Sequence, residues 1–518
     1  MIPSLQKNLA ALEKKDRNLA DCIRLSAPDG TYKEIAVSKT GVPVPVFCDG
    51  TAAHSLYNPV GEAKKIWDTM DISGAFILFA GIGGAYHIRE YLARLPDMSC
   101  IIAEQSPASL KSLFEIIDLS DILADPRVSL LTFSSDNFVQ SLMNVYLPVL
   151  YKKFQILPLR PWLSFTGISP EDIEGKCSDA LKVISADFSV QAHFGKIWMR
   201  NIFLNLKTAA MHQKKAPDFS REKTAYIAAA GPGLERDIPK LRSRRDSYIL
   251  FSTDTAWNTL ASYNIIPDVF ISIDAQAVSV LHAVREFGGN MTVILDLCAN
   301  PDIAFRALTS NTDIIFAAGG HPLARYAAAY APLPLLDTSA GTVTGAALDA
   351  ACSLGFKKIE FGGADFAYTD GKPYARGTYL SDTYGTRSDR LNPEENLFTG
   401  LMFRTPVRAI KTENGIIYST QILDSYAESL KQYKNTHQWN TSDFRNFPFE
   451  EFVRDYQCSL ETMLYNSRLE KTSVFYSLLP FAAWYRIKHG NTYGQNTVKE
   501  AFELALKLIE RYTLNHEG

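Results

Sequence analysis

Residues 337–371 read DTSAGTVTGAALDAACSLGFKKIEFGGADFAYTDG, and this stretch decides the expected fold. Small and hydroxylated residues come first, an Ala-rich amphipathic helix follows over residues 346–354, and Gly355 ends it. A buried strand is then predicted at residues 358–361, with GGAD after it. A loop that leads into a helix N-terminus presents backbone N–H groups to an anion, and open α/β sheets bind ligands beyond the carboxyl ends of their strands. The stretch therefore predicts a nucleotide-binding edge of an α/β sheet.

The chain has 518 residues, too many for one hydrophobic core, so two to four domains are expected. Its hydrophobic content of 46% and its net charge of −3 are ordinary, and they do not indicate a nucleic-acid partner. Seven cysteines without a CxxC pair are typical of reduced thiols. The charged N-terminus is unlike a signal peptide, and no apolar run reaches the ~18–20 residues of a membrane span. These features predict a cytoplasmic protein without a membrane span.

Three parts are expected along the chain. Residues 1–211 contain a strand–loop–helix unit, AFILFAGIGGAYHIREYLARL at 75–95, and predict a Rossmann-like α/β domain with bridging helices. Residues 212–435 begin with a polar linker and continue as alternating strands and helices, which predicts a doubly wound, mainly parallel sheet. Residues 436–518 have helical periodicity. Within the central part, residues 380–420 are polar and rich in turn residues, so a loop or lid is expected there.

A glycine-rich turn in the first part has two interpretations. Gly81, Gly83 and Gly84 lie between a predicted strand and a helix, and Glu104 ends the next strand. This order resembles the adenosine-binding arrangement of methyltransferases and dinucleotide enzymes. Tyr86 stands where the third glycine of that fingerprint belongs, and a tight turn without a ligand explains the glycines equally well.

Polar residues follow several predicted strands of the central part. Gly231, Pro232 and Gly233 come after one strand, Thr253 and Asp254 after the next, and Asp274 after a third. The sequence TSAGTVTG at 338–345, which includes Thr342, Thr344 and Gly345, precedes a helix. Helix capping explains each group alone, but four groups in one parallel sheet favour a binding crevice. No GxxxxGK[ST] motif is present, which argues against a P-loop kinase.

A cluster of carboxylates and phenols follows the last predicted strand: Asp365, Tyr368, Asp370 and Tyr374. Tyrosine hydroxyls donate hydrogen bonds without carrying a charge, which suits the developing charge of a departing phosphate. Packing is the alternative explanation for the tyrosines. No HExxH motif, Cys/His metal spacing or GxSxG motif occurs, and no histidine lies between His321 and His437. No metal site is therefore predicted.

These motifs, taken in order, resemble the Maf proteins, the motility-associated factor glycosyltransferases of flagellated bacteria. The resemblance covers roughly residues 55–420. It rests on GPGLERD (231–237), FSTDTAWNTL (251–260), IIPDVFISID (265–274) and residues 338–378, with YNPVGEAKKI (57–66), FAGIGGAYHIREYL (79–92) and HFGKIWMRNIFLNL (193–206) before them. The long GGADFAYTDG segment is specific, whereas GPGL alone is not.

The resemblance implies inverting transfer of a nonulosonic acid, of pseudaminic, legionaminic or sialic type, from a CMP-activated donor to Ser or Thr of flagellin. The central domain is similar to bacterial CMP-sialic-acid sialyltransferases, in which matching residues hold CMP. The matching positions are Gly231, Pro232, Gly233, Thr253, Asp254, Asp274, Thr344 and Gly345, with Tyr368 and Tyr374 near the donor phosphate. No cofactor is obligatory, although Mg²⁺ is possible.

Two departures from the sialyltransferase pattern bear on the mechanism. Gly233 replaces a serine, which removes a hydroxyl. The histidine that serves those enzymes as general base has no match between residues 321 and 437, so Asp365, Asp370 or a tyrosine is left as the candidate base. The same region also resembles archaeal MptE-like pterin pyrophosphokinases, which implies ATP with Mg²⁺ held by carboxylates such as Asp254, Asp274 and Asp365. A non-catalytic flagellin-binding protein is the third possibility.

Overall fold

The computed structural model describes residues 2–288, 290–413, 415–466 and 469–514. The chain divides into two compact units, one made of residues 1–193 with 482–501 and the other of residues 194–481 with 502–518. These units do not follow the three ranges expected from the sequence, and those ranges stay a prediction. The predicted α/β class, with largely parallel sheets, is confirmed, since each unit contains one such sheet. None of the described helices is long and apolar enough to cross a membrane.

The first unit is built on a four-stranded parallel sheet in the order β5-β4-β3-β6. The strands are β3 (Ala75–Ala80), β4 (Cys100–Glu104), β5 (Val128–Thr132) and β6 (Lys153–Pro158), and β3 and β4 are buried throughout. A hairpin of β1 (Tyr32–Val37) and β2 (Pro43–Phe47) accompanies it. The helices of this unit are α1 (Pro3–Glu13), α2 (Arg17–Leu25), α3 (Pro59–Thr69), α4 (Tyr86–Arg94), α5 (Pro107–Ile116), α6 (Ser120–Ala124), α7 (Phe138–Val145) and α8 (Arg160–Thr166).

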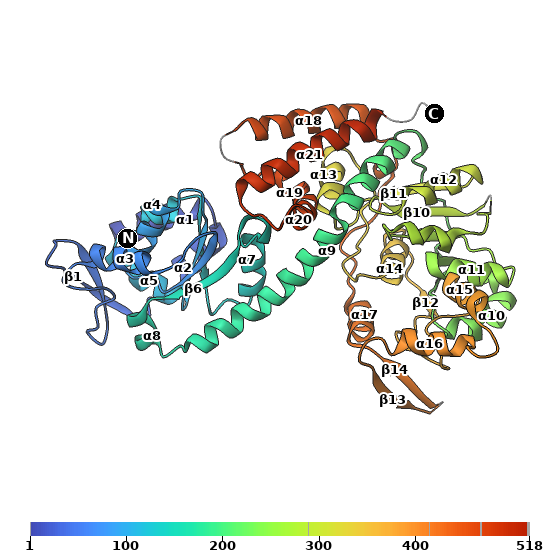
Figure 1. The fold of residues 1–518 in the computed structure, drawn as a ribbon, viewed down its shortest axis with the longest axis horizontal. Helices are drawn as coiled ribbons and strands as arrows, with labels where there is room; N and C mark the ends of the chain where they lie inside the picture. Colours follow the sequence, from blue (N-terminus) through green and yellow to red (C-terminus); the bar gives the residue numbers. More distant parts are fainter. Residues whose placement is uncertain (1, 289, 414, 467–468, 515–518) are drawn as a thin grey trace. The chain divides into compact units, whose positions relative to one another are not determined.

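The second unit contains a six-stranded parallel sheet in the order β11-β10-β9-β8-β7-β12 (Figure 1). Its strands are β7 (Thr224–Ala228), β8 (Tyr248–Thr253), β9 (Val269–Ser272), β10 (Thr292–Asp296), β11 (Asp313–Ala317) and β12 (Ile359–Gly362). From β7 to β11 each strand adds to the same side of the sheet, and β12 then returns to pair with β7. The direction of winding therefore reverses between β7 and β12, the position where open α/β sheets bind ligands.

Helices cover both faces of this sheet. The Ala-rich helix α14 (Val343–Ser353) packs Ala346, Ala347 and Ala350 against Ile227 and Phe251. Their small side chains let the helix lie close to the strands. The opposite face is covered by α10 (Gly233–Ser243) and α11 (Asp254–Ser262), while α12 (Pro301–Thr309) and α13 (Pro322–Tyr330) follow β10 and β11. Helix α14 begins at Val343, three residues before the predicted start, because the side chain of Thr342 caps it.

The expectation of a loop at residues 380–420 is wrong. The segment forms α15 (Tyr379–Arg387), α16 (Glu394–Met402) and a hairpin of β13 (Arg408–Thr412) and β14 (Gly415–Ser419). These elements are short and mostly exposed, so few apolar residues mark them in the sequence. Phe398 and Met402 are the buried residues of α16.

The long helix α9 (Pro170–His212) contains the point where the units divide. After the hairpin come α17 (Gln421–Gln432), α18 (Phe449–Tyr465), α19 (Ser473–Ser477), α20 (Leu479–Lys488) and α21 (Gln495–Leu514).

Two glycines of α9 allow a matched test of helix packing. A Cβ at Gly195 would overlap the backbone carbonyl of Pro480 in α20, whereas a Cβ at Gly175 meets nothing within 4 Å. We expect Gly195→Ala to lower the free energy of unfolding by about 1–3 kcal/mol, because backbone must move to admit the methyl group. Gly175→Ala is expected to raise it by up to about 1 kcal/mol through helix propensity. Urea unfolding of both variants measures the difference, and equal effects would contradict the tight contact at Gly195.

Candidate active site at the carboxyl edge of the six-stranded sheet

The glycine-rich turn of the first unit is filled by the chain itself. Glu104 is fully buried, and its carboxylate accepts hydrogen bonds from the N–H groups of Ile82 (3.2 Å) and Gln105 (3.1 Å). The Tyr32 hydroxyl (3.3 Å) and the Trp162 indole also donate to it. A ribose hydroxyl would have to displace these donors. The arrangement therefore favours the tight turn and gives no support to the methyltransferase alternative.

In the second unit, the GPG loop after β7 is closed by Asp365. The N–H of Gly231 donates to the carbonyl of Gly363 (2.8 Å), and the N–H of Gly233 donates to Asp365 Oδ2 (2.8 Å). A Cβ at Gly233 would lie 2.5 Å from Asp365 Oδ1, so the glycines are needed for the close approach of this carboxylate. The loop therefore binds the chain's own anion at the α10 N-terminus, rather than presenting both N–H groups to a phosphate as expected.

Asp365 and Asp370 share one guanidinium. Arg236 lies 3.7 Å from Asp365 Oδ1 and 3.2 Å from Asp370 Oδ2. Burial raises the pKa of Asp365, whereas the N–H of Gly233 and the charge of Arg236 lower it. Asp370 is 60% exposed and has a backbone φ of +54°. Both carboxylates therefore have partners in the chain, and the structure does not single out either one as a free base.

Thr253 and Asp254 are buried and bonded within the sheet edge. The Thr253 hydroxyl donates to the carbonyl of Ala228 (3.2 Å). Asp254 accepts from the N–H of Thr255 (2.6 Å) through one oxygen and from the Ser272 hydroxyl (2.7 Å) through the other. A ligand would have to replace these hydrogen bonds. Both side chains are therefore placed to stabilise the loop after β8. Their predicted role in nucleotide binding stays a prediction.

The N-terminus of α14 is more open. The Thr342 hydroxyl accepts a hydrogen bond from the N–H of Gly345 (3.0 Å). The first backbone hydrogen bond of the helix runs from the N–H of Ala346 to the Thr342 carbonyl (3.2 Å). Within the described chain, no hydrogen bond is found for the N–H groups of Val343 and Thr344. These N–H groups and the positive end of the helix dipole suit an anion. Thr342, Thr344 and Gly345 thus lie together at the helix end, where the sequence predicted an anion site.

Tyr374 lies among charged and phenolic groups beside this helix end. Its electrostatic neighbours are Tyr379, Tyr368, Arg404 and Tyr426. Burial raises the pKa of Tyr374, as do the phenols of Tyr379 and Tyr368, while Arg404 opposes the shift. The ring of Tyr426 would lie 3.4 Å from a Cβ at Gly341, in the loop that leads into α14. The predicted pair Tyr368 and Tyr374 therefore lies in one group of phenols, and the Tyr374 side chain is 36% exposed.

His282 is a candidate that sequence reasoning missed. Its ring meets the Tyr379 ring edge-on at 4.6 Å between centroids. The side chain is buried, and no hydrogen-bond partner is found for its Nδ1 in the described chain. Burial and Asp254 raise the pKa of Asp274 while the charge of His282 lowers it, and Asp274 Oδ1 accepts its hydrogen bond from the N–H of Gln276 (3.0 Å). The only signal in the sequence was a scarce residue type, eight positions after the Asp274 that follows β9.

Two asparagines of α9 form hydrogen bonds to the loops that follow β9 and β10. Asn201 Nδ2 donates to the carbonyls of Ala275 (3.1 Å) and Cys298 (3.0 Å). Asn205 Nδ2 donates to the carbonyls of Leu297 (3.0 Å) and Ala299 (2.8 Å). The HFGKIWMRNIFLNL motif therefore fixes the loops after β9 and β10 at the carboxyl edge.

His321 has a structural role. Its Nδ1 accepts the N–H of Leu323 (3.1 Å) and caps α13, and burial lowers its pKa to about 3.

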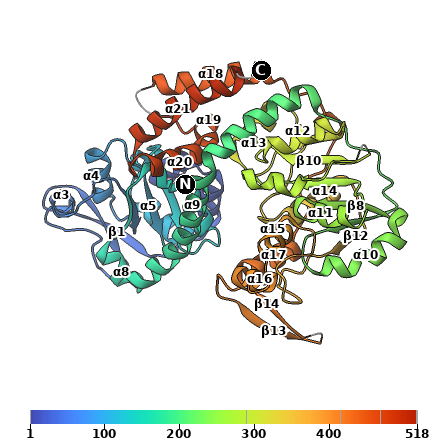
Figure 2. The same cartoon turned by 45° about the vertical axis from the view of Figure 1, so that its right-hand side comes forward.

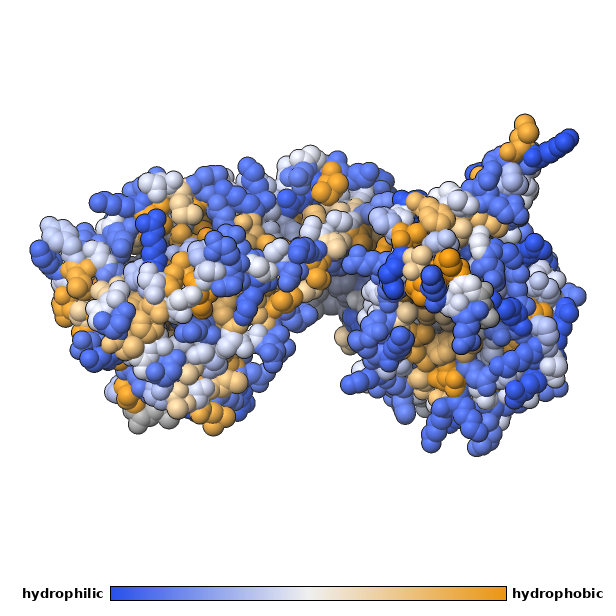
Figure 3. Space-filling view, turned by 90° about the horizontal axis from the view of Figure 1, so that it is seen from below, coloured by the Kyte–Doolittle hydropathy of each residue, from blue (hydrophilic) through white to orange (hydrophobic). Residues whose placement is uncertain are grey.

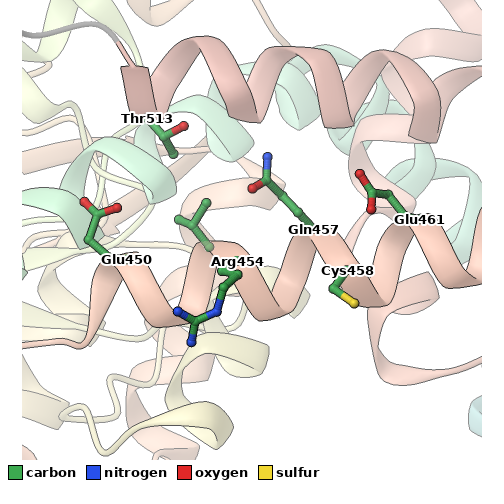
Figure 4. A pocket seen from close by; sticks show the side chains of 7 residues that line it. Glu450, Arg454, Gln457, Cys458, Glu461 and Thr513 are labelled. Atoms are coloured by element: carbon green, nitrogen blue, oxygen red, sulfur yellow. The ribbon is translucent and has the colours of Figure 1, made fainter.

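A separate cavity of about 430 Å³ lies between α18 and α21. Figure 4 shows Gln457 extending from α18 toward α21, which contributes Thr513, with Arg454 and Glu461 nearby on α18. None of the residues at the sheet edge borders this cavity. Its mixed charges do not point to one class of ligand.

Comparison with known proteins agrees with this class of fold, an α/β chain with largely parallel sheets. The family model described as "6-hydroxymethylpterin diphosphokinase MptE-like" matches residues 198–371. A solved Maf glycosyltransferase from Magnetospirillum magneticum AMB-1 aligns over 99% of this chain and 97% of its own, with a TM-score of 0.58 and 13% sequence identity. Both resemblances expected from the sequence are confirmed at these levels, a family model for the central segment and a fold for the whole chain.

Two uncharacterized proteins of Treponema pallidum (strain Nichols) are similar in sequence. One is 39% identical over 237 residues, which are 46% of this chain and 81% of that protein. The other is 41% identical over 164 residues, which are 32% of this chain and 78% of that protein. The chain belongs to the family of these treponemal proteins.

Proposed function

We propose that the chain is an inverting glycosyltransferase that moves a nonulosonic acid from a CMP-activated donor to a Ser or Thr hydroxyl of flagellin. The observation that carries the proposal is the grouping of an open helix N-terminus, neighbouring phenols and a buried histidine at one edge of a parallel sheet. The fold shared with a Maf glycosyltransferase supports it.

The α14 N-terminus and Tyr374 provide the donor side of the proposed reaction. The donor phosphate would accept hydrogen bonds from the N–H groups of Val343 and Thr344. Negative charge develops on the phosphate oxygen as its bond to the anomeric carbon breaks. Tyr374 carries its proton at neutral pH, as a phenol of ordinary pKa does, and its raised pKa keeps it so; its hydroxyl can therefore donate to that oxygen. Arg404 adds a positive charge close to the same phenol.

His282 is the proposed general base on the acceptor side. The acceptor oxygen forms the new bond to the anomeric carbon, its proton passes to the imidazole, and CMP leaves with the electron pair of the broken bond. Asp365 and Asp370 stay alternatives, although both already interact with Arg236.

The family-model match favours one second candidate, an MptE-like pterin pyrophosphokinase that uses ATP and Mg²⁺. Its metal would need carboxylates such as Asp254, Asp274 and Asp365. In the part of the chain that the structure describes, no three His, Cys, Asp or Glu side chains are grouped as a ready metal site. Both oxygens of Asp254 also accept hydrogen bonds within the chain. The phenols beside the α14 N-terminus therefore fit the glycosyltransferase better.

Calorimetric titration with CMP, CTP, ATP and S-adenosylmethionine, with Mg²⁺ or with EDTA, tests the proposed function. We expect CMP to bind in EDTA and Thr344→Trp to weaken it at least tenfold, because Thr344 is nearly buried at the α14 N-terminus and an indole there fills the space for the phosphate. Thr309→Trp is the matched control, since Thr309 is exposed at the far end of α12. Tight Mg²⁺-dependent binding of ATP without CMP would instead support the pyrophosphokinase.

A further inference from the structure

The hairpin of β13 and β14 has an open edge. Figures 1 and 2 both show it projecting from the second unit, with no described segment along the outer side of β13. Its sheet has two strands, and β13 is exposed along most of its length. Two-stranded hairpins are marginally stable alone, and an open edge presents backbone groups that can pair with another chain. This hairpin is therefore suited to accept a further strand.

The inner side of β14 is tied to the candidate site. Tyr418 exchanges two backbone hydrogen bonds with Tyr368, of 2.7 and 3.1 Å. The Ser419 hydroxyl also donates to the carbonyl of Phe366 (3.3 Å). Phe366 has a backbone φ of +45°, which is unusual for a bulky residue. Tyr368 in turn neighbours Tyr374. The hairpin is thus an extension of the segment that carries the two phenols.

The strand register shows which backbone groups of β13 face outward. The N–H and C=O of Tyr418 point to Tyr368, so they point away from β13. Tyr418 is paired with Ala409, and Ile416 is paired with Lys411. In an antiparallel ladder such pairs alternate with bonded ones, so the N–H and C=O of Ala409 and Lys411 point to the open edge.

The charge on this edge is positive. Residues 403–413, FRTPVRAIKTE, contain three basic residues and one acidic residue, Glu413, in the turn after β13. Arg408 is held by Asp424 (2.9 Å), whereas no ion pair of Arg404 or Lys411 is found among the described residues. Ile416, which pairs with Lys411, is 55% exposed. Figure 3 shows the face from which the hairpin projects, and hydrophobic residues are exposed there among hydrophilic ones. An acidic, extended polypeptide complements such an edge.

We propose that the outer edge of β13 is the docking strand for an extended, acidic segment of the acceptor polypeptide. The segment pairs with the outward backbone groups of Ala409 and Lys411. This inference rests on the proposed function, because it takes the acceptor to be a polypeptide. Three strand spacings, about 14 Å, separate the docked segment from Tyr368, so the modified hydroxyl is expected about four to five residues from that segment.

The test uses the full chain with 15-residue peptides that tile flagellin from the same organism. Hydrogen exchange measured by mass spectrometry is expected to slow in residues 405–412 when a docking peptide binds, because outward N–H groups become bonded. Lys411→Pro removes one outward N–H at an edge position that tolerates proline, and is expected to weaken peptide binding at least tenfold. Lys411→Ala keeps the N–H and is the matched control, expected to bind within about threefold of the unchanged protein.

The outcomes separate this inference from the proposed function. Binding by Lys411→Pro at unchanged affinity, or equal losses in the Pro and Ala variants, would overturn strand docking. Transfer to intact flagellin without binding of any tiled peptide would overturn it as well. CMP affinity is measured on the same samples, and unchanged affinity in Lys411→Pro shows that the site remains folded. Peptide docking without any CMP binding or transfer would leave the docking strand in place and overturn the glycosyltransferase.

Discussion

Replacement of His282 by alanine is expected to lower the rate of sugar transfer by about 10²–10⁴-fold, the typical contribution of a general base. The reason is geometric. The buried imidazole lies against Tyr379 with Nδ1 unpartnered in the described chain. The expected loss is in kcat, because the base acts on the acceptor hydroxyl. CMP affinity is expected to stay within about threefold. Release of CMP with flagellin as acceptor measures the rate, and calorimetry measures the affinity.

His321→Ala is the control for this prediction. His321 lies in the same unit and is half-buried, but it caps α13 and takes no part in the proposed chemistry. Loss of the cap is expected to cost about 1 kcal/mol of stability, with kcat per folded molecule unchanged. A His282→Ala enzyme that keeps its kcat would assign the base to Asp365, Asp370 or a tyrosine, as the sequence suggested. A parallel loss in both histidine variants would indicate a folding defect rather than lost chemistry.

Gly231→Ala is expected to reduce both stability and CMP binding. A Cβ at this position would overlap Asp365 and lie 2.5 Å from the carbonyl oxygen of Gly363. The loops after β7 and β12 must then move apart at the point where the winding of the sheet reverses. We expect a loss of about 1–3 kcal/mol in unfolding free energy. CMP affinity is expected to fall at least tenfold, since Tyr368 and Tyr374 follow directly in the displaced segment.

Gly400→Ala is the matched control, because its Cβ meets nothing within 4 Å in the exposed helix α16. Urea unfolding and calorimetry on both variants give the two quantities. Normal stability of Gly231→Ala would show that Asp365 does not need to approach the loop. Lost stability with intact CMP affinity would show that the junction of β7 and β12 supports the fold without supporting the donor site.

The parallel sheet and several site features could be predicted from local patterns. Short β-rich runs that alternate with helical ones are enough to predict parallel strands, and the structure confirms them. Thr342 and Gly345 were placed correctly at a helix start, because a hydroxyl before a helix is a local signal. The close approach at Gly231 and Gly233 was found, whereas its partner within the chain, Asp365, was not predicted. Local sequence identifies a close approach without identifying what approaches.

The remaining features depend on residues that are distant in the sequence. Gly233 and Asp365 are separated by 132 residues, and Asn201 and Ala275 by 74. The ring of His282 packs against Tyr379, which begins α15 and is distant from it in the sequence. Sequence reasoning sought the general base between His321 and His437. It therefore passed over His282, which precedes that range.

Local composition thus settles which backbone conformations are possible: strands where β-branched residues cluster, helix starts where hydroxyls cap them, and close approaches where glycines leave space. Those preferences act over a few neighbouring residues, so they can be followed along the chain. Which groups meet is decided by the order of the strands, because β12 pairs with β7 and brings residues 363–379 across the carboxyl edge. Burial at that edge then raises the pKa values of Tyr374 and Asp274. Desolvation depends on the whole surrounding fold, and no local stretch of sequence specifies it.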